Sequence, residues 1–164
     1  MKPDISQYIK IHGKDLGRLC SSLCQNHFDA EDLYQATWEK VIRNYKKYDE
    51  SRPFDKWLWS ICINAHKDML KNPFRRRVVS FDSSEDLERI LLSVPTTEQD
   101  RDDCIVLHKA ISRLEPQKRQ VIALYYFKDL STAELSQILN IPEGTVKSRL
   151  SSARAQIRKE LNNE

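Results

Sequence analysis

The sequence predicts an all-α fold of two small helical domains joined by a flexible linker, with a helix-turn-helix in the C-terminal domain. Two observations favour helices: the 164 residues include only three glycines, and apolar residues recur every three or four positions over long stretches. A third observation predicts the helix-turn-helix: the pattern from Leu130 to Leu161 fits a short capped helix, a tight turn and a longer basic helix. With 40% hydrophobic and 31% charged residues, the chain can form compact cores under a well-solvated surface.

Three helices are predicted in the N-terminal domain. The first spans residues 5–26, although two glycines in its middle leave open a division into shorter pieces. The second follows Asp29, which can act as its N-cap. The third runs from Phe54 to about Lys71, where the pair Asn72-Pro73 ends it because the residue before a proline disfavours helical geometry.

A linker is predicted over residues 73–99, between a domain at 1–72 and a domain at 100–164. Its serines, acids and proline are typical of a connecting segment, with one short helix expected at 87–92. Residues 79–104 hold 8 acidic and 2 basic residues, whereas the segments on either side are net basic.

Two helices are expected before the helix-turn-helix. One covers about residues 101–114. The next begins at Pro116, a residue that suits the first turn of a helix, and continues through residue 127.

The helix-turn-helix has recognisable start and stop signals. Ser131 and Glu134 form a capping box, Asn140 suits a left-handed helix end, and Pro142 prevents simple continuation. The apolar positions of the second helix then repeat as one buried stripe: Val146, Leu150, Ala153, Ile157 and Leu161.

The second helix of such a motif places its first residues in the DNA major groove. Small polar and basic residues lie off the apolar stripe there, and they suit contacts to base edges and phosphates. A basic helix face can also be merely solvated, but the capped helix and turn before it favour DNA binding. The candidate −35 contacts are Thr145, Lys147, Ser148, Arg149, Ser151 and, one turn on and better placed for phosphate, Arg154.

Nothing in the sequence predicts an enzyme, a cofactor or a metal centre. It has no glycine-rich phosphate loop, and Cys104 with His108 one turn away is more typical of a structural pair than of a catalytic one. The four cysteines fit buried thiols of a reducing cytosol. Zinc binding by Cys20, Cys24 and His27 stays open as an alternative, although their spacing is not that of a standard finger.

The chain lacks a signal-peptide core and any apolar run long enough to span a bilayer. A cytoplasmic protein without membrane insertion is therefore expected.

Two stretches resemble the extracytoplasmic-function (ECF, group IV) sigma factors of bacterial RNA polymerase. The C-terminal matches to that family's promoter-reading end are Leu130, Ser131, Glu134, Pro142, Gly144, Thr145, Val146, Lys147, Ser148, Arg149, Leu150, Ala153 and Arg154. The N-terminal matches, to its core-binding and promoter-melting domain, are Asp29, Glu31, Asp32, Leu33, Gln35, Val41, Phe54, Trp57, Leu58, Ile61, Asn64 and Asp68. The chain departs from the family pattern at Ala36, Trp38 and Ser136.

The resemblance implies an alternative sigma factor with several partners. A region 2-type domain at 1–72 would bind the β′ clamp helices of core RNA polymerase, recognise the −10 element and start DNA melting. A region 4-type domain at 100–164 would read the −35 element and contact the β flap. The linker would pass near the active-site cleft, and a membrane-linked anti-sigma factor would mask both domains of a protein that is monomeric when free.

Two sets of N-terminal residues are candidates under this resemblance. Asp32, Gln35 and Glu39 share one helix face by their spacing, and the family match assigns that face to core polymerase. For melting, an unstacked base needs a ring to stack on and an amide to read its edge. The candidates are Tyr48, Asn64 and Trp59.

Trp57 and Trp59 lie about 200° apart on a helix and cannot share one face. Trp57 follows the apolar stripe, which predicts a core position for it and a surface position for Trp59.

Two other functions fit parts of the chain. A helix-turn-helix regulator, such as the output module of a response regulator, would bind DNA without polymerase, but it leaves the stretch 29–68 unexplained. A helical adaptor that binds no DNA would require that Lys147, Arg149 and Arg154 make no contact with nucleic acid.

Overall fold

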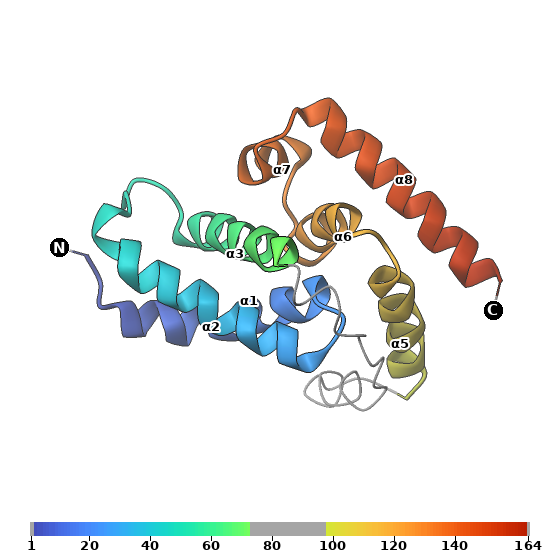
Figure 1. Cartoon of the computed structure of the whole chain (residues 1–164), viewed down its shortest axis with the longest axis horizontal. Helices are drawn as coiled ribbons and strands as arrows, with labels where there is room; N and C mark the ends of the chain where they lie inside the picture. The colour runs from blue at the N-terminus through green and yellow to red at the C-terminus, as the bar shows by residue number, and fades with distance from the viewer. Residues whose placement is uncertain (1, 73–97, 164) are drawn as a thin grey trace.

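The computed structural model describes residues 2–72 and 98–163, and every regular element in these two ranges is a helix, as predicted (Figure 1). The N-terminal lobe (residues 2–72) contains α1 (Ile5–Leu23), α2 (His27–Asn44), the 3-10 turn η1 (Tyr45–Lys47) and α3 (Phe54–Lys71). The C-terminal lobe (residues 98–163) contains α5 (Glu98–Ser112), α6 (Pro116–Ile122), its π-helical extension η3 (Ala123–Phe127), α7 (Thr132–Leu139) and α8 (Glu143–Asn162). The predicted linker helix at 87–92 and the side chain of Cys104 fall outside the described residues.

The N-terminal lobe forms because its three helices each bury one apolar stripe. α1 is a single helix despite its glycines, and it contributes the fully buried Leu16, Leu19 and Leu23. The predicted N-cap of α2 is wrong by three residues: the cap is Asn26, whose Oδ1 accepts from the Asp29 N–H at 2.8 Å. Asp29 instead occupies the first turn and accepts from the Asn26 amide at 3.0 Å, so the two side chains satisfy each other.

The C-terminal lobe has the predicted helix-turn-helix. Ser131 Oγ accepts from the Glu134 N–H at 3.1 Å, and Asn140 adopts the left-handed conformation with φ 55° and ψ 48°. The turn is closed twice by Ser136, since its hydroxyl donates to the Ile141 carbonyl at 2.6 Å and its carbonyl accepts from the Ile141 N–H at 3.2 Å. The serine that stands where the family usually has alanine therefore fixes the turn.

The two lobes pack against each other and share one apolar core. α3 lies beside α7, and α1 contacts α5, α6 and η3 (Figure 1). Lys67 Nζ donates to the Leu139 carbonyl at 3.2 Å at this junction. Deeper inside, Gln120 Nε2 lies 2.9 Å from His66 Nδ1, and both residues are about 2% exposed. The described structure is therefore a closed arrangement of the lobes.

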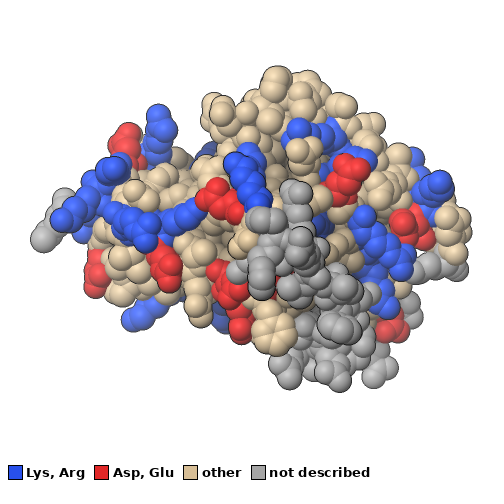
Figure 2. Space-filling view, viewed as in Figure 1, with Lys and Arg blue, Asp and Glu red and all other residues tan. Residues whose placement is uncertain are grey.

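Basic and acidic side chains alternate over both lobes on the face drawn in Figure 2. None of the helices within residues 2–72 and 98–163 is apolar over a length sufficient to cross a membrane.

Candidate nucleic-acid interface

The start of α8 presents polar side chains beside a buried stripe. Val146, Leu150 and Ala153 are at most 2% exposed and hold the helix on the C-terminal lobe. Among the candidates, three side chains are exposed and two more are half-buried at the edges of the same surface: Lys147, Ser148 and Ser151, with Thr145 and Arg149. The Lys147 ammonium lies 3.8 Å from the Glu143 carboxylate in an open i,i+4 pair that a ligand can displace easily. The arrangement leaves one lysine and several hydroxyls free to approach a groove.

Arg154 faces a different neighbour. Its Nε–H donates to the Tyr126 hydroxyl at 2.6 Å, and its guanidinium lies 5.3 Å from the Tyr125 ring centroid. The hydrogen bond to Tyr126 raises the pKa of Arg154 above its usual value. Arg154 is thus tied to η3, and its predicted contact to phosphate would require that this hydrogen bond be shared or broken.

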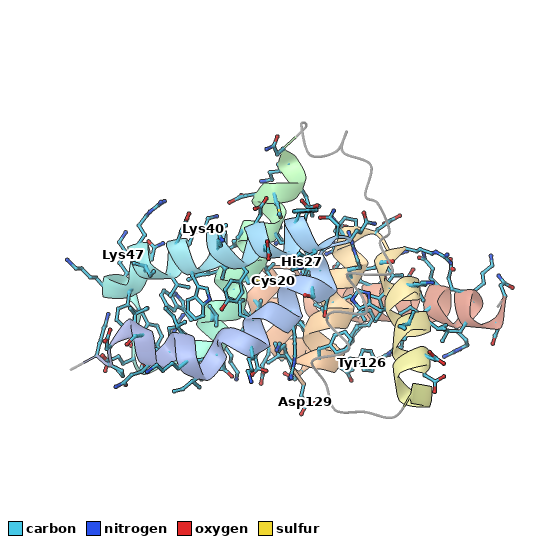
Figure 3. All side chains as sticks on the ribbon, turned by 90° about the horizontal axis from the view of Figure 1, so that it is seen from below. Cys20, His27, Lys40, Lys47, Tyr126 and Asp129 are labelled. Atoms are coloured by element: carbon cyan, nitrogen blue, oxygen red, sulfur yellow. The ribbon has the colours of Figure 1, made fainter. Side chains whose placement is uncertain are left out.

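The predicted polymerase face of α2 is open. Asp32, Gln35 and Glu39 are all exposed along the helix. Next to them, Lys40 Nζ forms an ion pair with the Asp68 carboxylate of α3 at 2.7 Å, which lowers the pKa of Asp68. Lys40 and Lys47 project outward from the same side of the lobe (Figure 3).

Tyr48 and Asn64 occupy contrasting environments. Asn64 is exposed on α3, as a reader of an extruded base must be. Tyr48 is only 5% exposed, stacks on Trp57 with ring centroids 4.7 Å apart, and donates its hydroxyl to the Arg52 carbonyl. Burial raises the pKa of Tyr48. In this arrangement Tyr48 closes its loop, and Trp57 is the ring that remains partly accessible.

The predicted positions of the two tryptophans of α3 are reversed. Trp59 is 3% exposed, and Lys128 of the C-terminal lobe lies over its ring with Nζ 4.7 Å from the centroid. Trp57, expected in the core, is only half-buried. The prediction failed because α3 contacts helices of both lobes, so it buries more than the single stripe that the sequence pattern assigns to it.

Three cysteines, Cys20, Cys24 and Cys62, are buried thiols, as expected. Cys20 lies inside the N-terminal lobe (Figure 3), and its Sγ is 3.9 Å from Cys62 Sγ. The hydrogen bond with the Cys62 thiol and burial raise the pKa of Cys20 far above its usual value. His27 Nε2 lies 2.8 Å from a Glu31 carboxylate oxygen, and no cluster of metal-ligating side chains occurs in the described parts of the chain.

Comparison with known proteins matches both lobes to sigma-factor families. Residues 8–77 match the model for Sigma-70 region 2, and residues 105–157 match the model for Sigma-70 region 4. The ECF RNA polymerase sigma factor SigW of Bacillus subtilis is 30% identical over 161 residues, which cover 93% of this chain and 86% of SigW. This chain is an ECF RNA polymerase sigma factor.

Other relatives agree with this assignment. SigE of Mycolicibacterium smegmatis is 32% identical over 159 residues, which are 95% of this chain but 61% of that longer protein. Two solved structures share the fold: RpoE of Bartonella quintana in complex with the anti-sigma factor NepR, and CnrH in complex with the cytosolic domain of CnrY. Their TM-scores are 0.74 and 0.67 at 23% and 22% identity, with 97% of this chain covered in both and 97% and 88% of the other chains. The alternative of a regulator that acts without polymerase is not favoured, and sigma factors are not known as enzymes.

The sigma factor also has a surface that sequence reasoning missed, an apolar groove of about 400 Å³ between α5, η3 and α8. Tyr126 and Phe127 are about half exposed along it, and Figure 3 shows Tyr126 next to α5. The groove is lined by Leu107, Ile111, Ile122, Tyr126, Phe127, Arg154, Ile157, Arg158 and Leu161. The aromatic run 125–127 was a possible signal, but a regular helix would not have predicted the wider π turn.

Proposed function

We propose that this sigma factor binds core polymerase through the N-terminal lobe and reads the −35 element through the start of α8. The observation that carries this proposal is the set of exposed polar residues on α8 beside a fully buried stripe. Phosphate contacts supply most of the affinity of such an interface, and groove contacts supply its selectivity. The protein would act where the polymerase is, in the cytoplasm.

Replacing Lys147 by Ala tests the −35 reader. In holoenzyme binding, the variant is expected to lose about 1–3 kcal/mol on a matched −35 sequence and much less on a scrambled one, because a base contact is lost. Lys159→Ala, on an exposed position near the far end of the same helix, is the control and should leave base preference unchanged. An equal loss on both sequences would show that Lys147 binds phosphate.

The core-binding face is tested by reversing Asp32 and Glu39 to Lys. The double variant is expected to bind core polymerase roughly tenfold or more weakly, because charge reversal opposes electrostatic complementarity at an interface. The matched control reverses Asp102 and Glu50, two acids exposed elsewhere, and should bind like the parent. Circular dichroism checks that both variants fold, and unchanged affinity in the first would remove this face from the interface.

We propose that the β flap and an anti-sigma factor approach the C-terminal lobe at the apolar groove. Exposed aromatic surface beside Arg154 and Arg158 suits an apolar helix that carries acidic residues. Complexes of the structurally similar RpoE and CnrH with NepR and CnrY support an anti-sigma partner, which would be membrane-linked. Melting through Asn64, with Tyr48 or Trp57 as the stacking ring, is part of the same proposal.

A further inference from the structure

A cavity with a volume of about 730 Å³ lies between the two lobes. One wall comes from the junction of α1 and α2 with Cys24 and Asn26, and from His66 of α3. The opposite wall comes from the start of α6, with Gln117 and Arg119. This volume is within the range of small-molecule sites, and the lining includes none of the residues proposed to contact the −35 element or core polymerase.

Arg119 is a buried cation that forms no ion pair within residues 2–72 and 98–163. It is 4% exposed, and its Nε and Nη1 are fully buried with no hydrogen-bond partner among the described residues. Asp29 and Glu115 also line the cavity, but no ion pair joins Arg119 to either acid. Burial lowers the pKa of Arg119, opposed only by the nearby Cys24 thiol. Burying a charged group without a partner costs free energy, and an anion bound next to Arg119 would offset that cost.

The other buried cation of the lobe junction is paired. Lys128 Nζ donates to the Asp15 carbonyl at 2.9 Å, lies 3.8 Å from the Asp15 carboxylate, and covers the Trp59 ring. His66 cannot add charge beside Arg119, because burial and the guanidinium lower its pKa to about 4. Unlike Lys128, Arg119 therefore has no acidic group paired with it within the described structure.

We propose that this cavity is a binding site for a small oxyanion, a carboxylate or a phosphate group, held against the Arg119 guanidinium. Because Nε and Nη1 are fully buried, an oxyanion in the cavity would contact the guanidinium through its remaining nitrogen, Nη2. The amide side chain of Gln117 on the cavity wall can bind the remainder of a larger ligand. Since both lobes supply the walls, the site is complete only in the closed arrangement. The proposal goes beyond the proposed function and does not depend on it.

The test titrates the full chain with sodium phosphate and with sodium succinate against sodium chloride at equal ionic strength. With at least one of the two anions, the Tm of the parent is expected to rise saturably by about 2–4 °C at millimolar concentrations. Arg113→Gln, at an exposed arginine directly after α5, controls for general salt effects and should show the same rise. Arg119→Met should show none. A rise with phosphate alone or succinate alone identifies which oxyanion source fits.

Two further measurements on Arg119 variants test the site. Without added anion, Arg119→Met should unfold at the same or a higher temperature than the parent, because an unbalanced buried charge is removed. Arg119→Lys keeps the charge but loses the planar fork, and should weaken anion binding about tenfold, which also serves if the Met variant does not fold. No saturable rise in the parent, or an equal rise in the Arg119 variants, would overturn the site irrespective of any polymerase result.

Discussion

Trp59→Ala is expected to lower the free energy of unfolding by about 3–5 kcal/mol, the usual cost of deleting a buried aromatic side chain. Trp59 is 3% exposed and carries the Lys128 ammonium over its ring, so the substitution opens a cavity and removes a contact between the lobes. Urea unfolding followed by circular dichroism at 222 nm measures the change, and the signal does not depend on the tryptophan removed.

The matched control is Trp57→Ala on the same helix. Trp57 is half-buried and stacks mainly on Tyr48, so about 1–2 kcal/mol is expected. If Trp57→Ala cost more than Trp59→Ala, the core position that the sequence pattern assigned to Trp57 would be right and the packing described for α3 wrong.

Acidification is expected to destabilise the closed arrangement between about pH 6.5 and pH 4 through His66. Burial, with Arg119 nearby, lowers the pKa of His66 to about 4 from a usual value of 6.5. The unfolded chain therefore binds a proton in this window before the folded chain does, and stability falls as the pH falls. The loss is about 1.4 kcal/mol per pH unit and reaches about 3 kcal/mol near pH 4.

Urea unfolding at pH 7, 5.5 and 4.5 measures this slope. His66→Gln should flatten it, whereas His12→Gln, at a half-buried ring of the N-terminal lobe, should retain it. The carboxylates of Asp4, Asp49 and Asp68 have lowered pKa values and contribute mainly below the window. An unchanged slope in His66→Gln would mean that other groups carry the pH dependence.

Elements with local signals could be predicted from the sequence. The bounds of α3, the cap at Ser131 and the left-handed Asn140 depend on neighbouring residues only, and the structure confirms them. The polar start of α8 was predictable for the same reason, since a periodic stripe determines which side chains remain outside.

Features that need a second lobe could not be predicted. Trp59 is buried by a residue 69 positions away in the chain, and Arg119 resembles an ordinary surface cation within "QKRQ". The apolar groove depends on a π turn, for which the spacing of apolar residues gives no signal. The sequence pattern of a helix does not show which of its residues the other lobe buries, so these positions can be assigned only from the packed structure.

The contact between the lobes has a thermodynamic consequence for promoter use. Elements named −10 and −35 are about 25 base pairs apart, or roughly 85 Å of B-form DNA at 3.4 Å per step. If, as proposed, the N-terminal lobe opens the −10 element and the start of α8 reads the −35 element, lobes that touch, with α3 beside α7, would not reach both at once. Only the open fraction of molecules would then be competent, and the apparent dissociation constant would equal the intrinsic one divided by that fraction. A closed state favoured by about 2.7 kcal/mol would weaken apparent binding to the promoter about 100-fold. A partner that separates the lobes would restore the full affinity of the open form.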